Sequence, residues 1–188
     1  AEKVVNEMKL IADKMEIDIH EIIEAAKSKP FGFQPFYPGP GLGGHCIPID
    51  PYLLTWKAKQ YDMNTKFIEL SGDINNSMPN YVIDKIGNAL NLFKKTFLNS
   101  KILILGVAYK KNVDDDRESP SFEIMKILKK KKISFEYNDP YFDRIRKGRQ
   151  NKIVKKSIIL NKNNLKKFSA VLLVTDHDKY NYKYIAKN

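Results

Sequence analysis

The stretch "SKILILGVAYKKNVDDDRESP", residues 100–120, decides the fold class of the chain. Its apolar run, which ends in Gly106, is typical of a β-strand that is buried on both faces. A charged loop follows. Ser119 and Pro120 then form a typical helix start, because serine caps the first turn and proline fits its first position. The stretch therefore predicts a strand, a loop and a helix in succession.

The same alternation continues towards the C-terminus. "ISFEYNDP", residues 133–140, has the composition of a second strand. "LKKFSAVLLVTDH", residues 165–177, reads as a short helix and a third strand. Strands that alternate with helices predict a parallel, doubly wound sheet of the Rossmann-like α/β class. We expect this domain to cover residues 98–188.

Residues 1–97 follow a different pattern and are expected to form a helical domain. Asp18 can cap a helix there, with Glu21 at the third helical position. A longer apolar stripe steps by three or four residues, as one face of a helix does; it comprises Phe67, Leu70, Ile74, Met78, Val82, Ile86, Leu90 and Phe93. The length of the stripe favours a helix-mediated homodimer. The alternative is a stripe that packs entirely within the chain.

Composition limits the class of protein. The 188 residues carry 33 Lys and Arg against 22 Asp and Glu, a net charge of +11. The excess of positive charge is mostly scattered lysine, and no RNA-binding or helix-turn-helix signature accompanies it. These lysines are therefore interpreted first as a solvated surface and second as a means of attracting anionic small molecules. Nucleic-acid binding is the weakest of the three interpretations. No apolar window reaches the roughly 18 residues of a membrane span, and no signal peptide is recognisable. One cysteine fits a reducing compartment, so we expect a cytoplasmic protein that binds neither nucleic acid nor membranes.

That single cysteine lies in "GLGGHCIPIDP", residues 41–51. Gly43 and Gly44 would let a ligand approach the backbone closely. A thiol in such a loop suits a nucleophile, although a lone cysteine is also commonly a small buried apolar residue. His45 could act as a base, but a role through packing or its backbone is preferred. The histidines and Cys46 lack metal-ligand spacing, so no metal site is expected.

The loop after the first predicted strand offers a second candidate site. Lys110 and Arg117 add positive charge near a helix N-terminus, which favours phosphate. The alternative is a charged loop in which Asp114–Asp116 pair with its own cations. No G-x-G-x-x-G occurs there, so a dinucleotide would not be bound by that device. Further on, "VTDHDKY", residues 174–180, could hold a catalytic His–Asp pair, but turn chemistry at a strand end is favoured.

Together, "GPGLGGHCIPIDP" and "GVAYKKNVDDDRESP" resemble two signatures of the UDP-glucose/GDP-mannose dehydrogenase family. The first is similar to the catalytic-cysteine loop and the second to the signature of the UDP-binding domain. "NEMKLIADKM" resembles the central helical domain. The stretch "FYPGPGLGGHCIPIDP", with "LTWKA", is most similar to the branch that acts on UDP-N-acetylglucosamine or UDP-N-acetylmannosamine.

The resemblance implies a four-electron oxidation of the sugar C6 alcohol to a carboxylate, with NAD⁺ used twice in succession. By analogy, Cys46 would attack the C6 aldehyde to form a thiohemiacetal, and a thioester would then be hydrolysed. A thiolate suits both steps because it is a good nucleophile and a good leaving group. Asp50 matches the aspartate that positions water or relays a proton.

Other residues match binding positions of the family. The resemblance places the substrate against Tyr109, Lys110 and a loop segment that comprises Tyr37, Pro38, Gly39, Gly41, Leu42, Gly43 and Gly44. Arg117 and His45 match positions on the cofactor side. A departure is Ile49, since some members carry lysine just before the aspartate.

The resemblance also implies what the whole enzyme would be. The N-terminal NAD-binding domain of the family is not found in this sequence, and the UDP-binding domain is expected to be incomplete. We therefore expect part of a UDP-N-acetylhexosamine 6-dehydrogenase of surface polysaccharide biosynthesis, inactive as these 188 residues alone. UDP-glucose is the alternative substrate, and a non-catalytic dimerisation and nucleotide-binding module is the alternative function.

Overall fold

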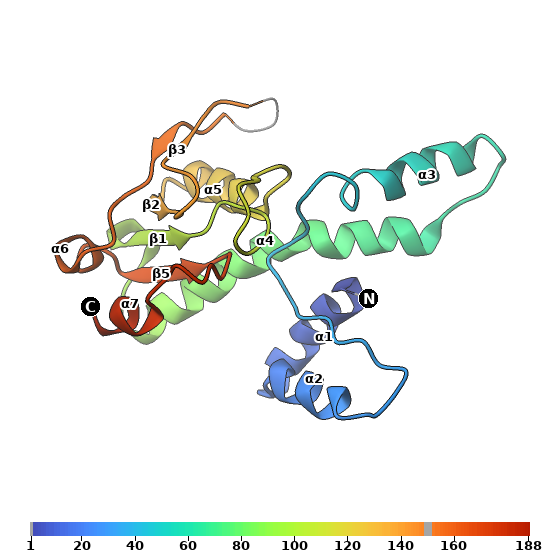
Figure 1. The fold of residues 1–188 in the computed structure, drawn as a ribbon, viewed down its shortest axis with the longest axis horizontal. Coiled ribbons are helices and arrows are strands. Elements are labelled where there is room, and N and C mark those ends of the chain that lie inside the picture. The colour runs from blue at the N-terminus through green and yellow to red at the C-terminus, as the bar shows by residue number, and fades with distance from the viewer. Residues whose placement is uncertain (1, 149–151) are drawn as a thin grey trace.

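The computed structural model describes residues 2–148 and 152–188. A lobe with a parallel sheet stands at one end, and two groups of helices project from it (Figure 1). The helical part comprises α1 (Glu2–Lys14), α2 (Ile19–Lys27), α3 (Asp50–Lys59) and the long α4 (Lys66–Leu92). The sheet lobe follows the short 3-10 helix η1 (Phe97–Asn99). The predicted α/β class is confirmed.

Helices α1 and α2 pack on each other, and α1 packs on α4. Asp18 caps α2, as its sequence predicts, by accepting a hydrogen bond from the His20 backbone N–H at 2.9 Å. Lys85 of α4 forms an ion pair with Asp13 of α1, with 2.9 Å between nitrogen and oxygen. Asn6 Nδ2 donates to Asn75 Oδ1 at 3.0 Å, which joins the same two helices in a buried setting.

The sheet has β1 (Lys101–Leu105) at its centre, β2 (Ser134–Asn138) on one side and β5 (Ala170–Leu173) on the other, all parallel. Helix α5 (Pro120–Lys130) connects β1 to β2, and Ser119 caps it by accepting from the Ser121 N–H at 3.3 Å. The antiparallel pair β3 (Arg144–Ile145) and β4 (Lys155–Lys156) leads to α6 (Lys162–Leu165), and α7 (Tyr182–Lys187) ends the lobe.

Alternate residues of β1 build two cores. Ile102 and Ile104 face α4 and α5, in a cluster with Ile86 and Leu128. Leu103 and Leu105 face the opposite side, where Leu165 and Tyr180 cover them with Ile185 of α7. Helical segments therefore cover both faces of the sheet, as a doubly wound arrangement requires.

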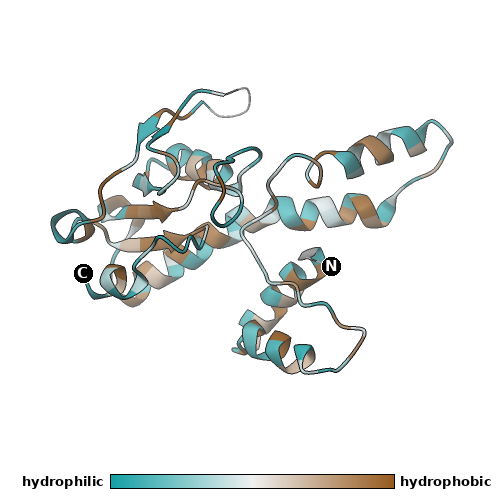
Figure 2. Ribbon diagram, viewed as in Figure 1, coloured by the Kyte–Doolittle hydropathy of each residue, from teal (hydrophilic) through white to brown (hydrophobic). Residues whose placement is uncertain are grey.

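The apolar stripe on α4 serves two environments. Towards its C-terminal end, Ile86 and Leu90 are buried in the core of the sheet lobe, so this part packs within the chain. Towards its N-terminal end, Phe67 and Leu70 are 73% and 58% exposed on the arm that α4 forms with α3. The alternation of brown and teal along this arm is visible in Figure 2. Within the described ranges, no helix is long and apolar enough to cross a membrane.

Candidate functional site

The loop with the only cysteine leads directly into α3. The carbonyl oxygen of Cys46 accepts hydrogen bonds from the backbone N–H groups of Ile49 at 3.0 Å and Asp50 at 2.8 Å, and this turn starts the helix. The Cys46 side chain is exposed, and its Sγ lies 3.8 Å from His45 Nδ1. Asp50 is the first residue of α3 and is also exposed. The thiol is therefore held on an ordered turn and is accessible to a ligand.

This cysteine loop is docked on the loop that connects β1 to α5. The Gly44 N–H donates to the carbonyl oxygen of Arg117 at 2.8 Å. The Tyr109 side chain fills the space beside both glycines: a Cβ at Gly43 would lie 2.5 Å from the Tyr109 Cβ. Gly44 has a φ of +97°, which favours glycine, and its Cβ would meet the Tyr109 ring at 3.1 Å. The two sequence signatures are therefore in direct contact with each other.

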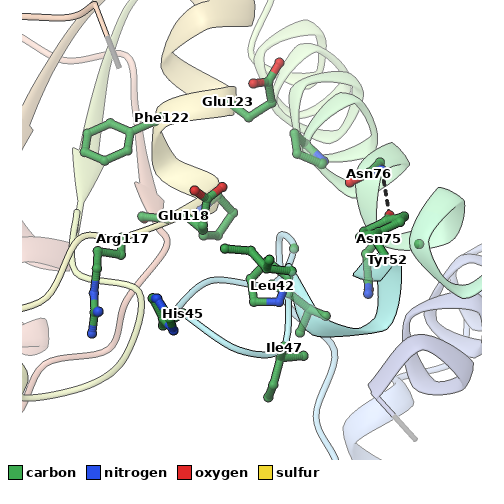
Figure 3. A pocket seen from close by; sticks show the side chains of 18 of the residues that line it. Leu42, His45, Ile47, Tyr52, Asn75, Asn76, Arg117, Glu118, Phe122 and Glu123 are labelled. Atoms are coloured by element: carbon green, nitrogen blue, oxygen red, sulfur yellow. Dashed lines mark hydrogen bonds between the residues drawn. The ribbon is translucent and has the colours of Figure 1, made fainter. Parts of the chain in front are cut away.

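A pocket of about 740 Å³ lies between the cysteine loop, α4 and the start of α5. Figure 3 shows Leu42, His45 and Ile47 on one side of it and Glu118, Phe122 and Glu123 on another. Tyr52 and Asn76 close it towards the arm, where the Asn76 side-chain amide donates to the Tyr52 hydroxyl at 3.4 Å. The predicted site residues on its lining are Gly41, Leu42, Gly44, His45 and Arg117.

The other predicted site residues, including the predicted catalytic pair Cys46 and Asp50, lie outside this lining. Tyr37 donates its hydroxyl to Glu24 Oε1 at 2.8 Å, and the Gly39 N–H donates to Asn6 Oδ1 at 2.9 Å, so this end of the loop is tied to α1 and α2. Pro38 lies between Tyr37 and Gly39 in the sequence. Lys110, which follows Tyr109 in the β1–α5 loop, is exposed.

Arg117 is paired within its own loop. Its Nε lies 3.0 and 3.1 Å from the two carboxylate oxygens of Asp115, and one terminal nitrogen lies 2.6 Å from Oδ2. The hydrogen bond from Arg117 holds the pKa of Asp115 below its ordinary value, and Asp115 in turn raises the pKa of Arg117. The internal ion pair considered as an alternative is therefore present, while the Arg117 side chain remains 60% exposed.

Asp116 is a pocket residue that the sequence interpretation did not select. It lines the pocket, and burial, followed by the charges of Asp115, Asp114 and Asp139, raises its pKa. The run of three aspartates was the available signal, because like charges in one loop disfavour ionisation of the most buried one.

The second missed feature is Asp139, the partner of His177 at the strand ends. His177 is fully buried and lies 3.2 Å from Asp139 Oδ2, measured from Nε2. The neighbours considered for a His–Asp pair, Asp176 and Asp178, instead face Lys111. A histidine with no exposed surface cannot contact a substrate in this conformation, so the structure supports a structural role. Over residues 2–148 and 152–188, no group of three or more His, Cys, Asp or Glu is arranged to hold a metal ion.

Comparisons with known proteins agree with the two signatures. Residues 3–77 match the central domain, and residues 103–188 the UDP-binding domain, of the UDP-glucose/GDP-mannose dehydrogenase family. A UDP-N-acetyl-D-mannosamine dehydrogenase from Methanocaldococcus jannaschii is 42% identical over 123 residues, which are 65% of this chain and 26% of that protein. A UDP-N-acetyl-D-glucosamine 6-dehydrogenase from Salmonella typhi is 30% identical over 177 residues, 94% of this chain and 40% of that one.

A solved structure of a UDP-D-ManNAc dehydrogenase from Pyrococcus horikoshii superimposes with a TM-score of 0.82 at 28% identity, covering 99% of this chain and 41% of the other. The chain thus spans less than half the length of these relatives. Matches to two domains of one family, in their family order and over most of the residues, confirm the resemblance. The chain belongs to the UDP-glucose/GDP-mannose dehydrogenase family and carries its central and UDP-binding domains.

Proposed function

We propose that this chain is the cysteine-loop and nucleotide-binding part of an NAD-dependent dehydrogenase that oxidises C6 of a UDP-N-acetylhexosamine to the uronate. One observation carries the proposal: the hydrogen bond from Gly44 to Arg117 holds the exposed thiol loop against the loop of the UDP-binding domain. A substrate in which a diphosphate joins a sugar to a nucleoside would reach both loops. The proposal includes a boundary near residues 97 and 98 between the central helical domain and the UDP-binding domain.

Cys46 is the proposed nucleophile. Its thiolate would add to the C6 aldehyde carbon and make that carbon tetrahedral, because an aldehyde is a poor hydride donor until a nucleophile has added. After loss of hydride the sugar is held as a thioester, which water cleaves to the carboxylate and the free thiol.

Asp50 is proposed to assist the hydrolysis. It begins α3, and its N–H is bonded to the Cys46 carbonyl at 2.8 Å, so its backbone position is fixed relative to the thiol. An exposed carboxylate one helical turn from the nucleophile can orient water or accept its proton.

The cofactor would approach from the Arg117 side. Bound NAD⁺ would supply the hydride acceptor for both oxidations. Arg117 and His45 fit this use, because both are exposed at the pocket and the arginine can donate to an anionic group.

The nucleotide sugar is proposed to contact Tyr109, Lys110 and the loop from Tyr37 to Gly44. Tyr109 already contacts Gly43 and Gly44, so a nucleotide bound against Tyr109 would also affect the position of the cysteine loop. The substrate class follows the named activities of the relatives at 42% and 30% identity, which act on UDP-N-acetylhexosamines. We place the reaction in the cytoplasm, in the synthesis of surface polysaccharide.

A homodimer through the central helices completes the proposal. Exposed apolar side chains on α1 and α3 support it: Ile11 is 55% exposed, Leu53 58%, Leu54 57% and Trp56 63%.

The experiment that tests the proposed function is turnover by the intact enzyme on UDP-N-acetylglucosamine, UDP-N-acetylmannosamine and UDP-glucose, with uronate and NADH measured together. Two NADH per uronate from an N-acetylhexosamine is expected, and the absence of uronate from every sugar would contradict the proposal.

A further inference from the structure

A buried polar cluster lies where the three parallel strands end, and the proposed reaction does not use it. Asp139 follows β2 and is 3% exposed, while His177 follows β5 and is 0% exposed. Asp139 Oδ2 accepts hydrogen bonds from the backbone N–H groups of Val107 at 2.6 Å and Ala108 at 3.0 Å, directly after β1. The same oxygen lies 3.2 Å from His177 Nε2. One carboxylate oxygen therefore connects all three strand ends.

His177 extends this cluster into the middle of the β1–α5 loop. The Asn112 backbone N–H donates to His177 Nδ1 at 3.0 Å. Because a backbone N–H can only donate, Nδ1 carries no hydrogen, and the neutral ring donates from Nε2 to Asp139. The Asn112 side chain also donates to Asp178 Oδ2 at 2.6 Å and accepts from the Asp178 N–H at 3.0 Å. The loop is thus fixed both at its start and at Asn112.

The position of the Asp139 carboxylate has a consequence for phosphate binding. The strand order β2-β1-β5 puts the point where the topology reverses between β1 and β5. In open parallel sheets, the amides that follow the strand at this point commonly bind the phosphates of a dinucleotide. Here the N–H groups of Val107 and Ala108 already donate to Asp139. The phosphates of a nucleotide would therefore bind farther along the loop, in the segment that carries Lys110.

We propose that Asp139 and His177 are positioning residues for the nucleotide site. They fix the β1–α5 loop so that Tyr109 packs on the cysteine loop and Lys110 remains available for a nucleoside diphosphate. The inference rests on the proposed function, because it takes this loop as the nucleotide site. It adds two residues that contact no substrate and act through the backbone of the loop.

Asp139 cannot be replaced by its amide without loss. Its other oxygen, Oδ1, accepts from the Tyr141 N–H at 2.8 Å, so both oxygens act as acceptors. Asn at this position would direct its NH₂ group at N–H donors on one side. A buried donor without an acceptor is costly, and small displacements of binding groups reduce affinity strongly, so Asp139→Asn should weaken UDP binding by about tenfold or more.

His177 allows a rescue test. His177→Ala removes both the donor to Asp139 and the acceptor for Asn112, and UDP binding should weaken by about the same factor. His177→Gln retains one donor and one acceptor in its amide and should restore most of the affinity. A role limited to filling space predicts that an apolar side chain of similar size, as in His177→Leu, restores the UDP affinity as well as His177→Gln does, whereas the proposal predicts that only His177→Gln restores it.

The experiment is titration calorimetry of UDP with the unsubstituted protein and the variants, together with their melting temperatures. Asn138→Ala is the matched control, since Asn138 ends β2 beside Asp139 but its amide donates to Ser157 Oγ at 3.2 Å and the Ile158 carbonyl at 2.7 Å, away from the loop. This control should lower the melting temperature and leave the UDP dissociation constant within about twofold.

Unchanged UDP affinity in Asp139→Asn and His177→Ala would overturn the inference, as would an equal loss of affinity in Asn138→Ala or no rescue by His177→Gln. Should Asp139→Asn fail to fold, the two His177 variants decide. Absence of UDP binding by the unsubstituted protein would contradict the proposed nucleotide site itself, and the inference with it.

Discussion

Gly44 and Arg117 are joined by a backbone hydrogen bond of 2.8 Å, and this bond connects the loop of the only cysteine to the loop of the UDP-binding domain. Gly44 stands two positions before Cys46, and Arg117 is itself a proposed functional residue of the β1–α5 loop, which also carries Lys110. The contact explains how residues far apart in the sequence can act on one substrate. It also makes the site sensitive to small steric changes at Gly43 and Gly44.

Gly43→Ala should disrupt this contact. The added Cβ would lie 2.5 Å from the Tyr109 Cβ and 3.2 Å from the Glu118 carbonyl oxygen, so one of the loops must move. Overpacking of this kind costs about 1–3 kcal/mol, which chemical denaturation can measure. Gly148→Ala is the control, because a Cβ there meets nothing within 4 Å. Equal stability of the two variants would contradict the close packing of Tyr109 on Gly43.

Cys46→Ala should abolish uronate formation in the intact enzyme, with a fall of at least about two orders of magnitude. The aldehyde would have no thiol to add to it, so the second oxidation would not proceed. Mass spectrometry of the product and the yield of NADH per sugar measure this directly. Cys46→Ser is the companion variant, since it keeps the size of the side chain but provides a poorer nucleophile. Uronate produced at the original rate by either variant would exclude the nucleophile assignment.

Lys110→Ala should weaken UDP binding by about threefold to tenfold, because an exposed lysine contributes a point charge to a phosphate. The effect should shrink as salt is added. Lys129→Ala removes the same charge from the last turn of α5 and is expected to leave binding unchanged. The two dissociation constants, measured at low and high salt, separate a local contact from the general effect of the net charge of +11. The same loss in both variants would argue against a site at Lys110.

The acid stability of the protein should depend on Asp115. The hydrogen bond from Arg117 lowers the pKa of this carboxyl below its ordinary value of 3.8 in the folded protein. Its contribution to stability is therefore present above the unfolded pKa and is lost as the pH falls through the folded pKa. Asp115→Asn should flatten the fall in melting temperature below about pH 4. An unchanged acid profile in this variant would contradict the ion pair.

Asp116 provides the control of opposite sign. Burial raises its pKa in the folded protein, so its contribution to stability is present below the unfolded pKa and is lost as the pH rises through the folded pKa. Asp116→Asn should therefore raise the melting temperature near neutral pH. A lower melting temperature there would show that the Asp116 carboxylate makes stabilising contacts that outweigh its burial.

Local patterns were sufficient to predict the strand β1, the start of α5 at Ser119 and the cap of α2 at Asp18. Each of these depends on neighbouring residues, either through continuous burial or through a side chain that caps its own helix. The two loops of the candidate site were identified for the same reason, since their glycines, prolines and charged residues lie close together in the sequence.

Contacts between distant segments could not be predicted. Asp139 and His177 are separated in sequence, and nothing local to either shows that β2 and β5 flank β1 on opposite sides. The two environments of the apolar stripe on α4 could not be predicted for the same reason. The periodicity of the stripe predicts a helix, but it does not tell which residues face the sheet and which, like Phe67, remain exposed. The pairing of Arg117 with Asp115 was one of two alternatives that the sequence left open.

The most direct test of the central claim is turnover by the intact enzyme on UDP-N-acetylglucosamine, UDP-N-acetylmannosamine and UDP-glucose in parallel, before and after alkylation of Cys46. The proposed function predicts uronate and two NADH per molecule from a UDP-N-acetylhexosamine, at a rate about tenfold or more above that with UDP-glucose, and no uronate after alkylation. Uronate formation that survives complete alkylation of Cys46, or that occurs only with UDP-glucose, would contradict it.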